Sequence, residues 1–159
     1  MKRVTVTGTI MAMVLLAGLA ISLTGCFKII LPGAGGSANE VNIGASGASN
    51  VGSLEFELVY DSTALEAVGV EKGKLADNAM LEFTIARPGR VWVGLVDSNG
   101  INGNGSLVTV SFRVVGEGET ASQLTLENIE AYDATTLIDI VTRATPGNLS
   151  TPPSISFTP

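Results

Sequence analysis

The chain contains no histidine, and its 159 residues include one cysteine and few aromatic residues. Without histidine it cannot build a Ser-His-Asp or Cys-His catalytic arrangement, and a zinc site is disfavoured. One cysteine cannot form a disulfide within the chain, so a hydrophobic core must stabilise the fold. Aromatic residues make up 5% of the chain, which leaves little material for the row of exposed rings that sugar-binding sandwiches use.

Basic residues are also scarce. The chain has 9 Lys and Arg against 15 Asp and Glu, and its formal net charge is -6. A surface of this sign repels phosphate backbones, so no nucleic acid is expected as a partner.

The first 26 residues have the order of a secretory signal. A basic head (Met1 to Arg3) precedes an apolar run (Ile10 to Leu23), and "LTGC" (Leu23 to Cys26) follows. This ending resembles the lipobox of bacterial lipoproteins, which implies removal of residues 1–25 and a lipid on Cys26. The mature chain would carry a charge of -8. We therefore expect an exported protein, anchored by lipid to the cell membrane and facing outward.

An uncleaved transmembrane helix is the alternative for this segment. Such a helix needs roughly 20 apolar residues, and Thr5, Thr7 and Gly8 interrupt the run early. Residues 26–39 then form a lipidated N-terminus and a tether, because "LPGAGGSAN" (Leu31 to Asn39) is rich in glycine and small residues.

Residues 40–143 consist of short alternating segments separated by turn residues, which predicts an all-β, two-sheet sandwich. Residues 144–159 are rich in Pro, Ser and Thr and predict a tail, with a last edge strand at 154–157 as an option. A further strand at 28–30 is also an option. The expected strands span 40–43, 52–60, 65–70, 80–86, 90–97, 107–115, 123–130 and 137–143.

Two segments of this sandwich raise the question of function. In "SLEFELVYD" (53–61) the even positions from Leu54 to Tyr60 are apolar, whereas Ser53, Glu55 and Glu57 alternate with them and face either water or a protein. "GRVWVGLVD" (89–97) is apolar on both faces. Either a loop or tail covers its second face, or that face is a docking surface.

Catalytic and metal sites find little support. Glu55 and Glu57 lie about 7 Å apart on one strand face, a separation that an inverting glycosidase would accept. A solvated face explains the pair better, and no catalytic residue is expected. The loop Asp97 to Ser106 fails as an EF-hand, because Ile101 and Val108 stand where oxygen ligands are required. Its Asn-Gly pairs predict positive φ instead, although Asp97 and backbone carbonyls could still hold calcium.

Three stretches together resemble a cohesin domain: "NVGSLEFELVYDSTALEAVGVEKGKL", "GRVWVGLVDSNGINGNGSLVTVSFRVVG" and "SQLTLENIEAYDATTLIDIV". The resemblance covers roughly residues 40–143. It implies a jelly-roll sandwich of eight or nine strands, related to carbohydrate-binding modules and without catalytic activity. Such a module binds dockerin, a small helical protein module, on one flat sheet face. Calcium is then expected in the partner, and no cofactor or metal is expected here.

The resemblance also proposes a site. The family's Asn and Asp, two apart, fall on Ser53 and Glu55, which match neither residue. The family's exposed apolar contacts correspond to Val93 and Leu95, and a contact loop corresponds to Ala134 to Leu137. This hypothesis requires Val93 and Leu95 to be uncovered, and it expects Leu95→Asp to weaken binding while leaving the fold intact. The candidate partner-binding residues are Ser53, Glu55, Glu57, Val93, Leu95, Asp97 and Leu137.

The function that follows is recruitment of a dockerin-bearing protein to the cell surface, with a polysaccharide-degrading enzyme as one candidate. The alternative is direct polysaccharide binding through Trp92 or Tyr132, and a third is an envelope domain without a dedicated partner. The family's first strand is either shortened to residues 28–31 or missing, which would leave a bare sheet edge.

Overall fold

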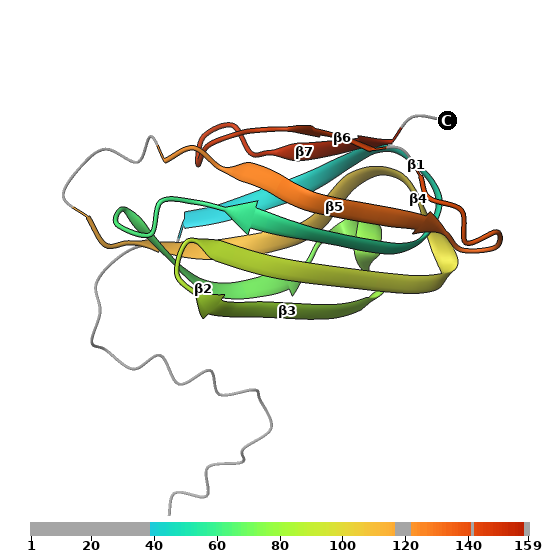
Figure 1. The fold of residues 1–159 in the computed structure, drawn as a ribbon, viewed down its shortest axis with the longest axis horizontal. Helices are drawn as coiled ribbons and strands as arrows, with labels where there is room; N and C mark the ends of the chain where they lie inside the picture. Colours follow the sequence, from blue (N-terminus) through green and yellow to red (C-terminus); the bar gives the residue numbers. More distant parts are fainter. Residues whose placement is uncertain (1–38, 117–121, 141, 158–159) are drawn as a thin grey trace, which may run out of the picture. The chain divides into compact units, whose positions relative to one another are not determined.

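The computed structural model describes residues 39–116, 122–140 and 142–157, and the described chain is almost entirely β-structure (Figure 1). One short 3-10 helix, η1 (Lys74–Ala76), lies between the second and third strands. The expected all-β sandwich is confirmed. Its strands are β1 (Asn39–Val59), β2 (Leu65–Lys72), β3 (Met80–Arg87), β4 (Arg90–Val114), β5 (Thr125–Asp133), β6 (Thr142–Thr145) and β7 (Ser154–Phe157).

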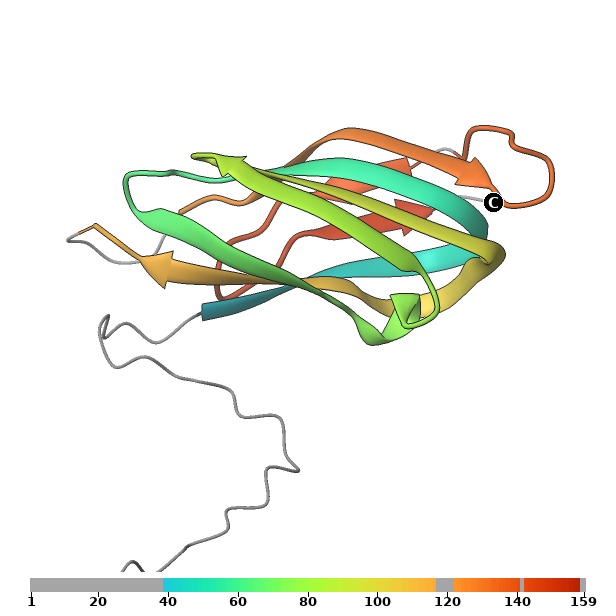
Figure 2. The same cartoon turned by 90° about the horizontal axis from the view of Figure 1, so that it is seen from below.

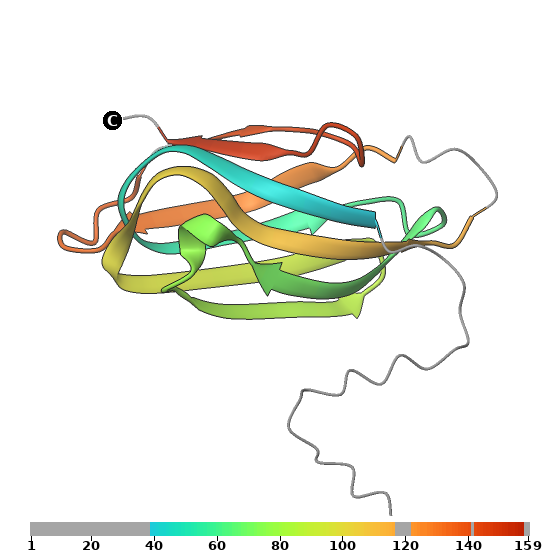
Figure 3. The same ribbon diagram turned by 180° about the vertical axis from the view of Figure 1, so that it is seen from behind.

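Two pairs of expected strands are each one long, bent strand. β1 and β4 pair antiparallel along nearly their whole length, with four register shifts between Ile43 and Ser53. Both strands curve back at the same end of the molecule, as Figures 1 and 3 show. The segment 97–106, expected as a loop, is therefore the bend of β4. Its Gly100, Gly103 and Gly105 have positive φ, as the Asn-Gly pairs predicted.

Side chains in this bend hold the two strands together. The amides of Gly47 and Asn50 on β1 donate hydrogen bonds to the side-chain oxygens of Asn104 (2.7 Å) and Asn102 (2.8 Å). The asparagines thus satisfy backbone groups that the register shifts leave without a ladder partner.

The bend places each long strand in both layers of the sandwich. Layer 1 has the order β3-β4-β1-β5 and uses residues 90–96 of β4 and 53–59 of β1. Layer 2 has the order β2-β4-β1-β7-β6 and uses the other halves of the long strands. Figure 2 shows the strands of layer 1 side by side, from β5 in orange to β3 in yellow-green.

The core lies between the layers and follows the predicted alternation. Leu54, Phe56 and Leu58 point inward from layer 1, and Val110 and Phe112 point inward from layer 2. The rings of Tyr60 and Phe112 meet edge to face, with centroids 5.1 Å apart.

The end of the chain is part of the sandwich, which corrects the expectation of a tail with an edge strand. β7 exists at the expected residues, but it lies between β1 and β6 and is not an edge. Ile155 and Phe157 are buried in the core. β7 pairs with β1 in parallel over Gly44–Ser46, so this part of the flank of β1 is not bare.

A second correction concerns the expected strand at 137–143. Leu137 and Ile138 are exposed in a loop, and β6 begins only at Thr142. Leu137 has a φ of 57°, which a strand cannot accommodate. Residues 1–38 lie outside the described residues, and with them the expected signal peptide, the tether, the strand at 28–30 and Cys26.

Candidate partner-binding face

The outward surface of layer 1 (the layer-1 face) is formed by the side chains of its four strands that point away from the core. Strand register places them in rows that run across β3, β4, β1 and β5. The rows are Met80-Val96-Ser53-Tyr132, then Glu82-Gly94-Glu55-Glu130, then Thr84-Trp92-Glu57-Glu127.

The first row forms an apolar end of the face. Met80 is 72% exposed and Val96 is 53% exposed, and the two residues are directly paired. A hollow lined by Ser53, Val96 and Leu137 links this row to the loop after β5. Leu137 is 75% exposed, so a large apolar side chain borders the hollow on the loop side. Clusters of exposed apolar side chains are typical of interaction sites, which makes this end of the face a candidate contact surface.

Asp133 fixes the loop that carries Leu137. Its carboxylate accepts hydrogen bonds from the backbone amides of Thr136 (2.7 Å) and Thr135 (2.8 Å), from the Asn50 side chain (2.9 Å) and from the Thr136 hydroxyl (2.9 Å). These donors, the Thr136 amide first, lower the pKa of Asp133 to about 2. The start of the loop that carries Leu137 is therefore held by an ionised side chain.

The second row is an acidic centre. Glu55 lies directly opposite Glu130 on β5, and on its other side Gly94 separates it from Glu82. None of the ion pairs among the described residues involves these three exposed carboxylates. Like charges opposite one another cost stability, so this row is unfavourable within the isolated domain.

The ring of Trp92 covers Gly94. A Cβ atom added to Gly94 would lie 2.9 Å from the indole, so any larger residue would push the ring aside. The ring separates two shallow hollows on the layer-1 face. The first is lined by Glu55, Met80, Glu82, Trp92, Gly94, Leu95 and Val96, and the second by Glu57, Thr84, Ala86, Arg87, Arg90 and Trp92.

An arginine at the end of the second hollow is already neutralised. Arg90 forms ion pairs with Glu57 and, at 3.0 Å, with Glu127, and these carboxylates, Glu57 first, raise the pKa of Arg90 above its usual range. Asn128 donates a further hydrogen bond to Glu57 (3.0 Å). Glu57 is thus directed into an internal network, and no paired-carboxylate chemistry with Glu55 follows from the geometry.

The predicted exposure of Val93 and Leu95 is wrong. Both residues are fully buried, because strand register places Val93 opposite Phe56 and Leu95 opposite Leu54 in the core. Since side chains alternate along a strand, the outward residues of β4 are Trp92, Gly94 and Val96. Leu95→Asp would place a charge in the core, so the expectation of an intact fold is also wrong.

Asp97 is buried as well, and its carboxylate accepts a hydrogen bond from the Asn99 amide (2.9 Å) within the bend of β4. Ser53, Glu55 and Glu57 face outward on β1 as expected, and Leu137 is exposed. Sequence reasoning missed Met80, Val96 and the position of Trp92 on this face. The pairing of β1 with β4 could have identified these residues. Paired residues on neighbouring strands point to the same side of a sheet, so the polar side of β1 determines which side of β4 faces outward.

Within residues 39–116, 122–140 and 142–157, no group of three or more acidic or cysteine side chains is placed to hold a metal ion. The same residues include no helix with the length and apolar character needed to cross a membrane.

Comparisons with known proteins agree with this architecture. The family model described as "Cohesin domain" matches residues 31–149. A non-cellulosomal cohesin from the hyperthermophilic archaeon Archaeoglobus fulgidus is 31% identical, with a TM-score of 0.62 over 77% of this chain and 80% of its own. A search of curated proteins gives no match.

Two cohesins solved in complex with dockerins share the fold at lower identity. The sixth cohesin of Acetivibrio cellulolyticus scaffoldin B is 20% identical, with a TM-score of 0.61 over 78% of this chain and 90% of its own. A type I cohesin from Clostridium thermocellum is 17% identical, with a TM-score of 0.59 over 77% and 85%. Cohesin domains are non-catalytic, dockerin-binding modules, which supports a role in protein–protein interaction. By the family match and the identity to the archaeal cohesin, the chain belongs to the cohesin family.

Proposed function

We propose that this protein is a lipid-anchored, non-catalytic receptor that recruits a dockerin-bearing protein through its layer-1 face. The observation that carries the proposal is the composition of that face within a cohesin fold. It joins an exposed apolar end around Met80 and Val96 to three carboxylates without an ion pair among the described residues. Burial of the apolar end would supply affinity, and the acidic row would steer a partner that carries Lys or Arg.

A helical partner suits the shape of this face. The outward rows lie across four strands, and Trp92 stands between two shallow hollows that side chains from a helix can enter. A dockerin presenting Leu or Ile beside Lys or Arg would place its apolar side chains near Val96 and its cations near Glu55 and Glu82.

The anchor is proposed from the sequence alone. "LTGC" at residues 23–26 supports lipid attachment to Cys26, with export and an outward orientation at the cell membrane. Labelling cells with a radioactive or alkyne fatty acid tests this part. The chain should take up label and sediment with membranes, and the Cys26→Ser variant should do neither. Label on the Cys26→Ser variant would contradict the anchor.

The identity of the recruited protein is a separate matter. A polysaccharide-degrading enzyme is one candidate, but the archaeal cohesin that is 31% identical is described as non-cellulosomal. Direct polysaccharide binding remains the second candidate function, because Trp92 and Tyr132 both lie on the layer-1 face. They are the only two aromatic residues in its three rows, and they lie two rows apart. Sugar binding normally needs a row of exposed rings, so the protein partner is favoured over a polysaccharide.

Calorimetry with dockerin modules tests the receptor function. The panel should include dockerins from the source organism and those of the complexes named above. We expect at least one to bind the full chain, and Val96→Asp to weaken that binding at least tenfold because it charges the apolar end. Thr109→Asp adds the same charge to the outer surface of layer 2 and should change affinity less than twofold.

Two outcomes would contradict the proposal. One is the absence of binding by every dockerin in the panel together with retention of the chain on a polysaccharide in a pull-down. The other is a Val96→Asp variant that binds as well as Thr109→Asp, which would move the contact to another surface.

A further inference from the structure

The two ends of the layer-1 face differ in chemistry, because one end is apolar and the other carries two arginines. Beyond the acidic row, the hairpin Arg87-Pro88-Gly89-Arg90 joins β3 to β4, and strand register pairs Arg87 with Arg90 across the turn. Gly89 has a φ of 83°, which this tight connection requires. The hairpin therefore places positive charge beside Trp92, at the end opposite Met80 and Val96.

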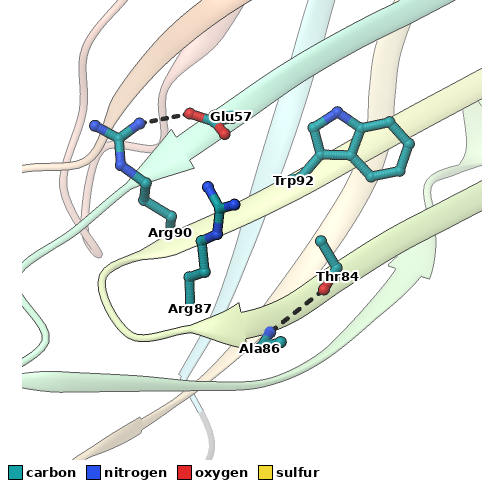
Figure 4. A pocket seen from close by; sticks show the side chains of 6 residues that line it. All are labelled: Glu57, Thr84, Ala86, Arg87, Arg90 and Trp92. Atoms are coloured by element: carbon teal, nitrogen blue, oxygen red, sulfur yellow. Dashed lines mark hydrogen bonds and ion pairs between the residues drawn. The ribbon is translucent and has the colours of Figure 1, made fainter.

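The two arginines differ in what neutralises them. Arg90 is held by Glu57 and Glu127, whereas no ion pair among the described residues involves Arg87, which is exposed. In the view of Figure 4 the Arg87 guanidinium extends between the Arg90–Glu57 pair and Trp92, and both arginines line the hollow. The hollow thus contains a fork of N–H donors in the geometry that carboxylates accept.

A second donor, the Thr84 hydroxyl, also lines the hollow. The Thr84 hydroxyl oxygen accepts a hydrogen bond from the Ala86 amide (3.4 Å), as drawn in Figure 4, so its own hydrogen is available to a ligand. Arg87 and Thr84 line the hollow, and the Trp92 ring forms an apolar wall. The Glu57 carboxylate also lines it but is already paired with Arg90, so the hollow can hold a short acidic side chain.

We infer that the partner presents an Asp or Glu side chain to the hollow formed by Arg87, Thr84 and Trp92. The same helix presents Lys or Arg to the acidic row of Glu55, Glu82 and Glu130. The inference rests on the proposed function, since it names the chemistry of the partner at the layer-1 face. It assigns the partner a dipolar contact surface, so that the acidic centre of the face and its hairpin end select opposite charges.

The spacing of the two charge centres suits a helix. The distance along β4 from the row of Gly94 to the hollow between Trp92 and Arg90 is about three residues, or about 10 Å. Two turns of an α-helix advance about 11 Å and return a side chain to nearly the same face. A basic residue and an acidic residue seven positions apart would therefore meet the two centres together. A helix docked in the reverse direction would bring like charges together at both, so the face selects one polarity.

Charge reversal tests the inference on the tightest-binding dockerin of the panel. Arg87→Glu should weaken binding of the full chain at least tenfold. Arg143→Glu is the matched control, because Arg143 is exposed on β6 in layer 2 and the change in net charge is the same. It should change affinity less than twofold. Replacing the dockerin's acidic residue with Lys should restore binding to Arg87→Glu and weaken binding to the native chain.

The outcomes separate the two proposals. If Val96→Asp prevents binding while Arg87→Glu behaves like Arg143→Glu, the layer-1 face is the contact but the carboxylate site is overturned. If neither Val96→Asp nor Arg87→Glu weakens binding, both proposals are overturned. A dockerin whose acidic residues can all be replaced with Lys without loss of affinity for the native chain would also overturn the carboxylate site.

Discussion

The outer surfaces of the two layers differ in how their polar groups are satisfied. On layer 2 the side chains pair with one another across the strands. Thr109 donates to Asn42 (2.7 Å), Ser46 donates to Ser156 (3.0 Å), and Arg113 forms an ion pair with Glu66 (2.7 Å). On layer 1, the acidic row makes no ion pair among the described residues, and Met80 and Val96 are exposed beside it.

Both surfaces belong to the same two long strands, so the difference does not arise from the fold. β1 and β4 bury one side of each half in the same core and turn the other side outward. On layer 2 the polar pairs named above bond one another across the strands. On layer 1 the acidic row has no such pairs within the described part of the chain, and Met80 and Val96 are more exposed than Val68 of layer 2. The alignment of Glu55 with Glu130 does not favour the stability of the isolated domain, and it is therefore consistent with the proposed contact on layer 1.

The largest expected effect distinguishes the two sides of a single strand in layer 1. Leu95→Asp should lower the free energy of unfolding by more than about 4 kcal/mol, because it places a charge in the core opposite Leu54. Val96→Asp, one residue further on, should keep the native unfolding midpoint. Urea denaturation followed by circular dichroism measures both variants. Equal midpoints for the two variants would contradict the assignment of Leu95 to the inward side and Val96 to the outward side of β4.

A smaller loss of stability is expected when a buried side chain of β7 is truncated. Ile155→Ala should destabilise the domain by about 2 to 4 kcal/mol, since Ile155 is fully buried between β1 and β6. Thr151→Ala in the exposed segment before β7 is the control. Urea midpoints that are the same for both variants would show that β7 does not belong to layer 2.

The sequence predicted the parts of this architecture that depend on one strand at a time. The strict alternation of Leu54, Phe56 and Leu58 with Glu55 and Glu57 identified the inward side of β1 correctly. In residues 90–96 of β4 both sides are apolar, so alternation alone does not show which side faces the core. Only pairing with β1 shows that Val93 faces inward and Trp92 outward, and pairing is a relation between distant segments.

Two further features depended on the same kind of relation. The long strands could not be predicted as continuous, because their bends are rich in glycine and asparagine, which ordinarily end a strand. The tail was expected to be peripheral from its Pro, Ser and Thr content. Its four-residue strand nevertheless lies between β1 and β6, and the side chains of Ile155 and Phe157 are buried in the core.

A modest effect on stability without an effect on binding is expected from layer 2. Asn42→Ala removes the acceptor of the Thr109 hydroxyl and should cost about 0.5 to 1.5 kcal/mol. Dockerin affinity, measured by calorimetry, should remain within twofold of the native value. A larger loss of affinity would place part of the contact on layer 2.

The smallest effect on stability should have the opposite sign. Glu55→Gln removes one of two like charges that face each other on β1 and β5, and should raise the free energy of unfolding by a few tenths of a kcal/mol. The same change should weaken dockerin binding, because it removes a contact for the partner's cation. Glu40→Gln, at the layer-2 end of β1, should alter neither. A Glu55→Gln variant that binds more tightly would indicate that the acidic row opposes the partner.

Fluorescence of Trp92 tests the central claim most directly, since Trp92 is the only tryptophan and lies between the two hollows of the layer-1 face. On titration with a dockerin that lacks tryptophan, its emission should shift to shorter wavelength and its quenching by acrylamide should fall, in step with the binding isotherm from calorimetry. Emission and quenching that stay unchanged at saturating dockerin would contradict docking on this face.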